Sequence, residues 1–142
     1  MQKHHSHSEE DTIEFSRQLA NDTKTGQIYC LHGEMGMGKS VFARAFIRTL
    51  MRDDTLEVPS PTFTLVQTYQ TDTTSIWHFD LYRLKTREEI YEIGWEEALI
   101  DNIVLIEWPE RLESLKPAHA IDIQFTAPTD TSREIRVTKG KV

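Results

Sequence analysis

Cysteine is nearly absent from this chain, because Cys30 is the single one among 142 residues, so no internal disulfide can form. A buried thiol in the apolar run IYCL is a simpler interpretation than a reactive one, and it suits a reducing compartment. No apolar run approaches the roughly 18 residues that a membrane-spanning helix requires, and the N-terminal residues lack the apolar segment of a secretory signal. We therefore expect a cytoplasmic protein that has no membrane partner.

Positive charge is also in short supply, with 16 basic against 23 acidic residues and a formal net charge of -7. This balance disfavours extensive sequence-independent binding of nucleic acid by the chain alone. No repeat or linker divides the chain, so we expect a single domain over residues 1–142, with residues 1–8 as a flexible tail. Histidines at positions 4, 5 and 7 have no cysteine or spaced carboxylate beside them, and we predict no metal site there.

Apolar periodicity predicts an alternation of helices and strands. We expect helices over residues 8–21, 39–51 and 86–101, the last with a capping box formed by Thr86 and Glu89. Extended segments are expected over residues 27–31, 62–69, 75–82, 102–108, 120–125 and 133–137, with a turn at residues 127–131. This order of elements predicts an α/β sheet with an antiparallel portion.

The glycine-rich stretch GEMGMGKS, residues 33–40, matches the pattern G-x-x-x-x-G-K-[ST] between an expected strand and an expected helix. Glycines such as Gly33 and Gly38 let the backbone curl so that its N–H groups point at phosphate oxygens. Lys39 is expected to reach the β- and γ-phosphates, and the Ser40 hydroxyl to bind Mg²⁺. A turn that merely connects a strand to a helix needs neither side chain, so the stretch predicts a nucleotide site.

Acidic residues near such a site are needed to hold Mg²⁺ or its waters. Glu107 ends the apolar run IVLIE and is the first candidate, although a strand-end surface glutamate is the alternative. Asp80 in HFDLYR is the second, and spacing alone does not separate a metal or water ligand from a partner of Arg83. The loop PSPTF, residues 59–63, is placed to sense the γ-phosphate or is an ordinary rigid turn.

Three further stretches, SPTFTLVQTY, HFDLYRL and LIEWPERL, accompany GEMGMGKS. Together they resemble the bacterial TsaE (YjeE) family, the ATPase of tRNA threonylcarbamoyladenosine biosynthesis, from about Glu10 to Val137. The resemblance implies a single-domain P-loop NTPase fold, with a mostly parallel central sheet, helices on both faces and an antiparallel portion. It implies ATP and Mg²⁺ as cofactors. It further implies two partner proteins, a transferase and its paralogous companion, which modify adenosine 37 in tRNAs that read codons beginning with A. The ATPase would then meet tRNA only through that complex.

The same resemblance implies a role for each matching position. The phosphates would be lined by Gly33, Gly36, Met37, Gly38, Lys39, Ser40 and Val41, and Mg²⁺ would be held by Ser40, Glu107 and Asp80. Thr62 resembles a switch threonine, and Asp80 a catalytic carboxylate that orients water directly or through the metal. Thr12 would approach the base, Arg133 would contact the nucleotide, and Trp108 would stand near the site beside the acidic Glu107. Two departures from the family pattern, Ser40 for threonine and Met37 for a smaller residue, leave the required hydroxyl and backbone N–H in place.

Two other classes of protein share a phosphate cradle. A small-molecule kinase needs an acceptor pocket and normally a mobile arginine-bearing lid, and the sequence offers no evident lid insertion. A GTP-dependent switch needs the guanine-reading pattern Asn-Lys-x-Asp, which is absent. We expect an ATPase that is slow in isolation, because a domain of this size lacks an obvious arginine finger.

Overall fold

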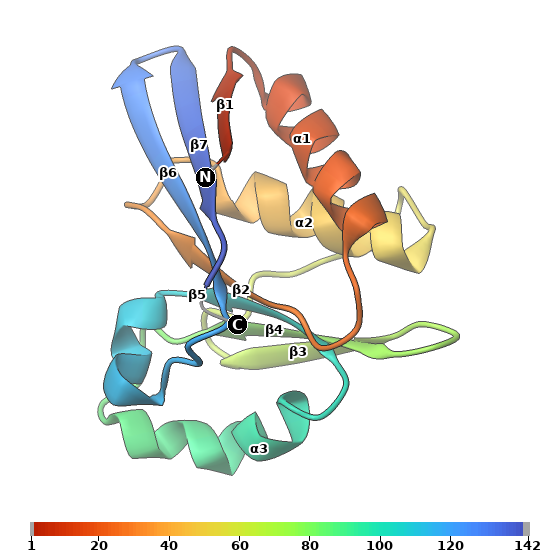
Figure 1. The fold of residues 1–142 in the computed structure, drawn as a ribbon, viewed down its shortest axis with the longest axis vertical. Coiled ribbons are helices and arrows are strands. Elements are labelled where there is room, and N and C mark those ends of the chain that lie inside the picture. Colours follow the sequence, from red (N-terminus) through yellow and green to blue (C-terminus); the bar gives the residue numbers. More distant parts are fainter. Residues whose placement is uncertain (1, 141–142) are drawn as a thin grey trace.

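The computed structural model describes residues 2–140, which contain one seven-stranded mixed sheet with helices on both faces (Figure 1). The strands are β1 (Gln2–Ser6), β2 (Ile28–His32), β3 (Val66–Gln70), β4 (Ser75–Asp80), β5 (Ile103–Glu107), β6 (Ile121–Thr129) and β7 (Ser132–Thr138). The α-helices are α1 (Glu9–Asp22), α2 (Lys39–Met51) and α3 (Trp95–Ala98), and the 3₁₀-helices are η1 (Arg87–Ile93) and η2 (Pro109–Leu115). The expected α/β class is confirmed.

The order of strands across the sheet is β1-β7-β6-β2-β5-β4-β3. Strands β6, β2, β5 and β4 are joined by three parallel pairings, while β1–β7, β7–β6 and β3–β4 pair antiparallel. The sheet thus has a parallel centre, and its antiparallel pairings are as many as its parallel ones. Parallel strands end at a common edge, so the loops that follow β2, β4 and β5 meet there.

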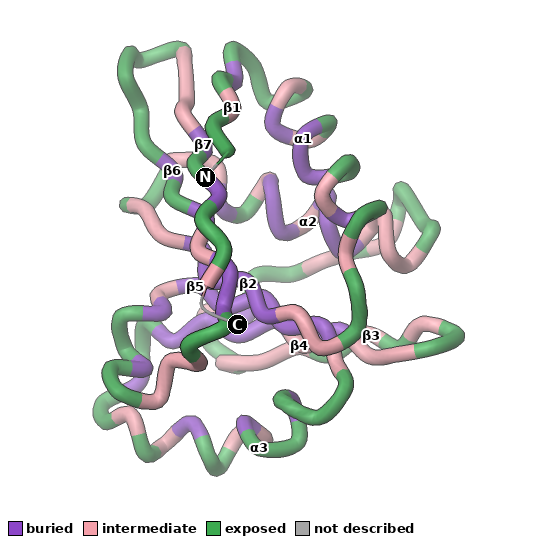
Figure 2. The backbone as a smooth tube through the Cα atoms, in the orientation of Figure 1, coloured by how far each residue is buried: buried purple, intermediate pink, exposed green. Residues whose placement is uncertain are grey.

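Each face of the sheet has its own apolar core. On one face α1 and α2 cover Tyr29 and Leu31 of β2, with Phe42 and Phe46 of α2 fully buried. On the other face η1, α3 and η2 cover a second cluster that includes Phe79. Figure 2 shows the buried positions gathered along the central strands and the inner sides of the helices. Strand β5 is buried at all five positions because both of its faces are covered.

The N-terminal segment is a strand, so the expectation of a flexible tail over residues 1–8 is wrong for the part that the structure describes. Residues 2–6 pair antiparallel with β7, from Gln2 opposite Val137 to Ser6 opposite Arg133. The His4 ring stacks on Phe15 with 4.5 Å between ring centroids, and Ser6 is buried while His5 is exposed. The sequence did not predict this strand, because the segment is polar and shows no apolar alternation. It forms by hydrogen bonding to the edge of β7, which would otherwise be unpaired.

The first helix follows its predicted start and end closely. Ser8 is the N-cap residue of α1, and its hydroxyl accepts a hydrogen bond from the Asp11 backbone N–H at 3.1 Å. The helix over residues 39–51 is also confirmed, as α2. The first residues of both helices, Glu9 of α1 and Lys39 of α2, line the same cavity.

The expected helix over residues 86–101 is divided into η1 and α3 at Gly94, which has a φ of 92°. A Cβ atom at Gly94 would lie 2.8 Å from the Trp77 ring, so the chain turns where only glycine fits. The predicted Thr86–Glu89 capping box is confirmed.

Two expected extended segments differ from the observed strands by more than two residues at one end. Residues 62–65 form a turn rather than a strand, so β3 begins only at Val66, after Leu65 in the left-handed region. Strand β6 continues to Thr129, so the turn to β7 is shorter than residues 127–131.

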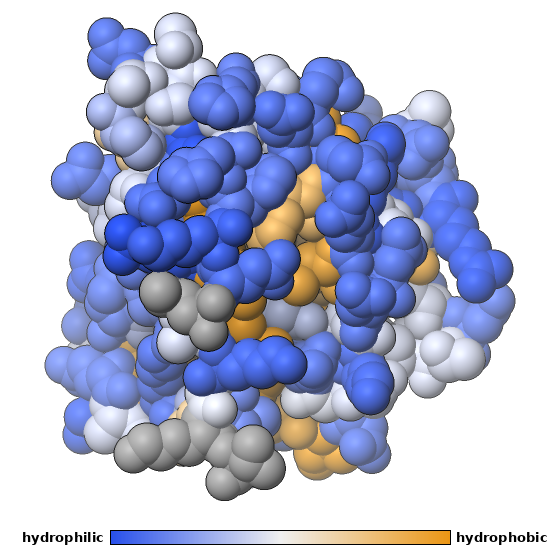
Figure 3. Space-filling view, turned by 45° about the horizontal axis from the view of Figure 1, so that its top comes forward, coloured by the Kyte–Doolittle hydropathy of each residue, from blue (hydrophilic) through white to orange (hydrophobic). Residues whose placement is uncertain are grey.

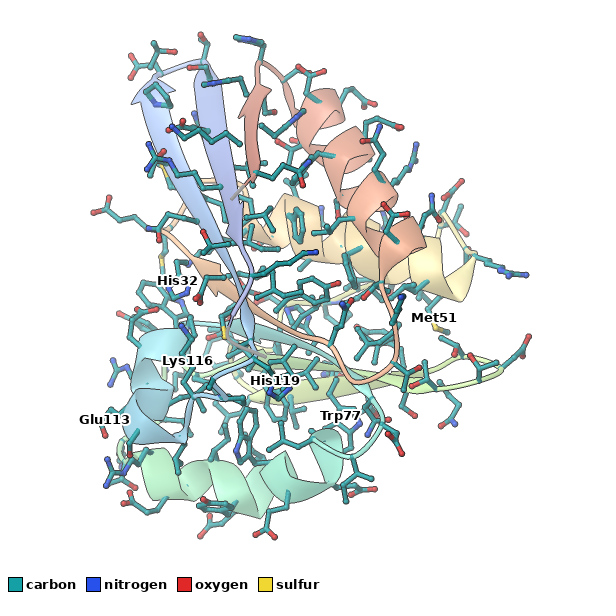
Figure 4. The ribbon with its side chains drawn as sticks, viewed as in Figure 1. His32, Met51, Trp77, Glu113, Lys116 and His119 are labelled. Carbon is teal, nitrogen blue, oxygen red and sulfur yellow. The ribbon has the colours of Figure 1, made fainter. Side chains whose placement is uncertain are left out.

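A polar cluster braces the end of β2 just before the glycine-rich loop. Asp122 of β6 accepts hydrogen bonds from His32 Nε2 at 2.6 Å and from Lys116 Nζ at 2.7 Å. Burial acts against the charged carboxylate, but these two donors prevail and the pKa of Asp122 is lowered. His32 and Lys116 lie on the same side of the molecule in Figure 4.

The surface is largely hydrophilic on the face seen in Figure 3, with apolar residues visible in a band between hydrophilic segments. Across residues 2–140, no helix combines the length and the apolar composition that crossing a bilayer requires.

Candidate functional site

A cavity of about 590 Å³ lies where the parallel strands end, a volume in the range typical of small-ligand sites. It is lined by the glycine-rich loop and the start of α2, the ends of β4 and β5, the N-terminal segment and the β6–β7 turn. The lining residues are Ser6, Ser8, Glu9, Thr12, Met35, Gly36, Gly38, Lys39, Ser40, Val41, Ser60, Thr62, Asp80, Glu107, Trp108, Asp130, Thr131 and Arg133.

All predicted site residues except Gly33 and Met37 line this one cavity. Gly33 has a φ of 143°, and a Cβ atom there would lie 2.8 Å from the Phe125 carbonyl oxygen. Its absent side chain lets the loop pass close to β6, which is a packing requirement. Met37 packs against the core under α1 and α2, and it is not among the residues that line the cavity.

The glycine-rich loop presents the beginning of α2 to the cavity. Gly38, with a φ of 104°, is the N-cap residue and supplies no side-chain cap, and the first turn of α2 holds no acidic residue. The N–H groups and the positive end of the helix dipole are therefore available to an anion. Arg133 of β7 donates a hydrogen bond to the Gly36 carbonyl oxygen at 3.4 Å, which ties the loop to the opposite wall.

Lys39, the first residue of α2, lines the cavity and is buried, with a residue exposure of 6%. Its Nζ lies 4.2 Å from the centroid of the Trp108 ring. Burial lowers the pKa of Lys39, and the negative charges of Glu107, Glu110 and Asp80 offset part of that shift. A dehydrated cation held on an aromatic face can accept a phosphate ligand without first losing a full hydration shell.

Two carboxylates face the ammonium from neighbouring strand ends. Asp80 and Glu107 stand opposite each other in the β4–β5 register and are exposed by only 4% and 5%. Asp80 Oδ1 accepts from the Tyr82 backbone N–H at 3.0 Å, and Oδ2 accepts from the Thr62 hydroxyl at 3.3 Å. The Thr62 and Ser60 hydroxyls are themselves 2.7 Å apart. The loop over residues 59–63 is thereby connected to the acidic pair.

The question of an Asp80–Arg83 pair is settled by the position of the guanidinium. Arg83 lies over the ring of Phe63, with Cζ 4.3 Å from its centroid. Asp80 is instead bound by Tyr82 and Thr62, as described above. Its carboxylate therefore belongs to the cavity.

Glu107 is held by a histidine that the sequence analysis did not single out. His78 Nε2 lies 2.8 Å from Glu107 Oε2, and both side chains are buried. The available signal was the alternation of a strand, which places His78 and Asp80 on one face of β4. Nothing in the sequence relates residue 78 to residue 107, because their contact depends on the pairing of β4 with β5.

Trp108 has a strained backbone, with φ 58° and ψ 51°, an uncommon conformation for a bulky residue. Its ring contacts both the Lys39 ammonium and the Tyr82 ring, whose centroid is 4.9 Å away. The conformation turns the chain directly after Glu107 and brings the indole to the cavity wall.

Five further lining residues were missed, because the sequence analysis took residues 1–8 as a tail and assigned no site role to the first turn of α1 or to the β6–β7 turn. They are Ser6, Ser8 and Glu9 at the N-terminal end and Asp130 and Thr131 in the turn. Thr12 is connected to this group, since its hydroxyl lies 2.7 Å from the Ser6 hydroxyl in a buried contact. These polar groups form the end of the cavity away from β4 and β5.

A metal ion at this cavity would need oxygen ligands from water or a bound nucleotide in addition to those of the protein. Among residues 2–140, no group of three or more His, Cys, Asp and Glu side chains is arranged to hold a metal ion. Ser40, Asp80 and Glu107 supply a hydroxyl and two carboxylates, which are hard oxygen donors that suit Mg²⁺. Since Mg²⁺ keeps several waters and takes the rest of its ligands from nucleotide phosphates, this incomplete set fits an ion that arrives with a nucleotide.

Comparison with known proteins gives one consistent family. The family model described as "Threonylcarbamoyl adenosine biosynthesis protein TsaE" matches residues 6–135. A relative from Rickettsia bellii, named tRNA threonylcarbamoyladenosine biosynthesis protein TsaE, is 43% identical over 131 residues, which are 92% of this chain and 90% of that protein. A relative of the same name from Aquifex aeolicus is 33% identical over 130 residues, 92% of this chain and 90% of its own.

A solved structure supports the fold. The crystal structure of Bacillus subtilis YdiB superposes with a TM-score of 0.78 at 24% identity, over 99% of this chain and 86% of that one. The family match spans the glycine-rich loop, both carboxylates and every residue that lines the cavity. The chain therefore belongs to the TsaE family.

Proposed function

We propose that this protein is a Mg²⁺-dependent ATPase of tRNA threonylcarbamoyladenosine biosynthesis, the pathway in the names of its relatives. One observation carries the ATPase proposal: the cavity holds an uncapped helix N-terminus with Lys39 and Ser40, directly opposite the buried Asp80 and Glu107. A positive cradle facing an acidic pair suits a phosphate chain on one side and a metal ion with water on the other.

In the proposed complex the β- and γ-phosphates occupy the start of α2. The backbone N–H groups of residues 36–41 and the Lys39 ammonium bind the phosphate oxygens. Ser40 and Glu107 would hold Mg²⁺, and Asp80 would orient the attacking water, either directly or as a further ligand of the metal. The bound Mg²⁺ would neutralise charge that develops on the phosphates during hydrolysis.

Thr62 is proposed to report the state of the γ-phosphate. Its hydroxyl donates to Asp80 Oδ2, and its loop carries Phe63, which is 80% exposed. A change at the γ-phosphate would therefore alter the Thr62–Asp80 contact, and with it a loop whose Phe63 side chain is exposed at the molecular surface. This gives hydrolysis a route by which it changes a partner complex.

The polar end of the cavity is assigned to the nucleoside. Thr12 would approach the base and Arg133 would contact the nucleotide, while Trp108 stands at the phosphate end beside Lys39.

Slow hydrolysis in isolation is part of the proposal. Arg133 is the arginine that lines the cavity within the described residues, and its guanidinium donates to the carbonyl oxygens of Gly36 and Ser132. These hydrogen bonds hold the Arg133 guanidinium against the backbone, so we do not assign it the role of an arginine finger. We propose that the transferase and its paralogous companion complete the site and bring tRNA to it. The cytoplasm suits this role and the buried free thiol of Cys30.

Reconstitution tests the proposal and its rival. Phosphate release from ATP and Mg²⁺ is measured for the protein alone and with the two partner proteins and tRNA, and threonylcarbamoyladenosine is quantified in the tRNA. We expect slow release alone, faster release in the full mixture, and loss of modification when the protein is omitted. Phosphate transferred to a small acceptor would establish the kinase alternative. Modification that continues unchanged without the protein would refute the pathway assignment.

A further inference from the structure

His78 lies in the sheet beside the proposed metal-binding carboxylate. In the β4–β5 register it stands opposite Leu105, so Glu107 is its diagonal neighbour on the same face of the sheet. The distance from His78 Nε2 to Glu107 Oε2 is 2.8 Å, and the two side chains are exposed by 3% and 6%. Water has little access to this contact.

The direction of the hydrogen bond follows from the chemistry of the two groups. A carboxylate only accepts hydrogen bonds, so Nε2 of His78 is the donor. The other ring nitrogen, Nδ1, is buried and has no hydrogen-bond partner among residues 2–140. The imidazole is therefore not a link in a longer polar chain, and its one polar contact is the carboxylate of Glu107.

An apolar side chain would serve the core at this position with less cost. A buried polar ring whose second nitrogen is unsatisfied is unfavourable compared with an apolar residue of similar volume. Ile76, two residues earlier on the same face of β4, is such a residue and is fully buried. A histidine at position 78 is better explained by what its donor does to Glu107.

We propose that His78 is a positioning residue that fixes the Glu107 carboxylate for Mg²⁺. By binding Oε2, the imidazole restricts rotation of the Glu107 carboxylate. It makes no hydrogen bond to the other oxygen, Oε1. Glu107 lines the cavity, so the fixed carboxylate is directed at the place where a nucleotide-bound Mg²⁺ or its water would stand. Outer partners of this kind orient metal ligands, and their loss typically weakens metal binding by about 10- to 100-fold. This inference rests on the proposed function.

The test measures how strongly Mg²⁺ and nucleotide bind together, without relying on hydrolysis. Isothermal titration gives the Kd of a nonhydrolysable ATP analogue with saturating Mg²⁺ and with EDTA, and the ratio of the two is the gain from Mg²⁺. His78→Leu removes the donor at similar size. His78→Gln keeps an amide donor close to the position of Nε2. Ile76→Val is the matched control, because it disturbs buried packing on the same strand and face without touching the hydrogen bond.

We expect the gain from Mg²⁺ to fall about 10-fold or more in His78→Leu, to stay within about threefold of wild type in His78→Gln, and to be unchanged in Ile76→Val. The Kd in EDTA should be similar in all four proteins. If His78→Leu does not fold, His78→Asn replaces it, because its shorter amide keeps a polar side chain but does not reach Oε2. In that case the comparison is between Asn and Gln.

Each result separates this inference from the proposed function. An unchanged gain in both His78→Leu and His78→Asn would overturn the positioning role, as would an equal loss in Ile76→Val. A wild-type protein that gains nothing from Mg²⁺, or that binds no nucleotide, would instead overturn the proposed function.

Discussion

The Lys39 ammonium offers a prediction whose size can be worked from its surroundings. In the proposed complex Lys39→Ala removes one charge-assisted hydrogen bond to each of the β- and γ-phosphates. Such bonds contribute about 1.5–3 kcal/mol each, so the gross loss for ATP is about 3–6 kcal/mol. The wild-type ammonium must leave the Trp108 ring, 4.2 Å from its Nζ, and a desolvated contact of this kind contributes about 2 kcal/mol.

The difference between these terms predicts a characteristic order of effects. For ATP the net loss is about 2.5 kcal/mol at the centre of the range, which weakens binding roughly 70-fold. For ADP one phosphate bond is set against the same Trp108 contact, so the net loss is within about 1 kcal/mol, or roughly fivefold. Adenosine makes no phosphate contact, and its affinity should not change.

The assay is isothermal titration of a nonhydrolysable ATP analogue, ADP and adenosine into wild type, Lys39→Ala and Arg44→Ala. Arg44 is the control because it lies on the same helix and carries the same charge but does not line the cavity. Circular dichroism melting checks that all three proteins are folded. Equal losses for the ATP analogue and ADP, or a similar loss in Arg44→Ala, would refute the assignment of Lys39 to the γ-phosphate.

Three further predictions concern the carboxylate pair, the loop and the free thiol. Asp80→Asn keeps the size of the side chain and one acceptor oxygen, so nucleotide affinity should be retained while hydrolysis falls about 10²- to 10⁴-fold. Single-turnover phosphate release measures this fall. Unimpaired hydrolysis would exclude a water-orienting role. Gly33→Ala should lower the free energy of unfolding by about 2 kcal/mol or more, because its Cβ would meet the Phe125 carbonyl oxygen at 2.8 Å in addition to the positive φ. Gly26→Ala, with a φ of 96° and open space around it, should cost about 1–2 kcal/mol. Urea titration of both variants measures the two costs, and equal costs would contradict the steric argument. Burial raises the pKa of Cys30 to about 12, so the folded protein keeps its thiol proton while an unfolded thiol loses it near its ordinary pKa of 9.0. The free energy of unfolding should therefore fall as pH rises from 9 towards 12. A thiol reagent at pH 8 should label Cys30 only after denaturation. Rapid labelling of the folded protein would show that the thiol is accessible.

The sequence by itself determined the parts of the site that are encoded over short distances. The pattern from Gly33 to Ser40 predicts a loop followed by the start of α2. The reason is that this motif joins the end of a strand to the start of a helix, and its glycines allow the backbone to turn between them. Glu107 was predicted from its place at the end of an apolar run, and both ends of α1 from capping and periodicity. Local backbone preferences and side-chain alternation are sufficient for such features.

Tertiary structure alone decided which distant residues meet. Strand β1 exists because β7 has an edge to pair with, and a polar segment gives no sign of that partner. The register of β4 on β5 sets Asp80 opposite Glu107 and makes His78 the diagonal neighbour of that carboxylate. Such contacts depend on strand order and register, which are settled by burial across the whole sheet and not by neighbouring residues in the chain.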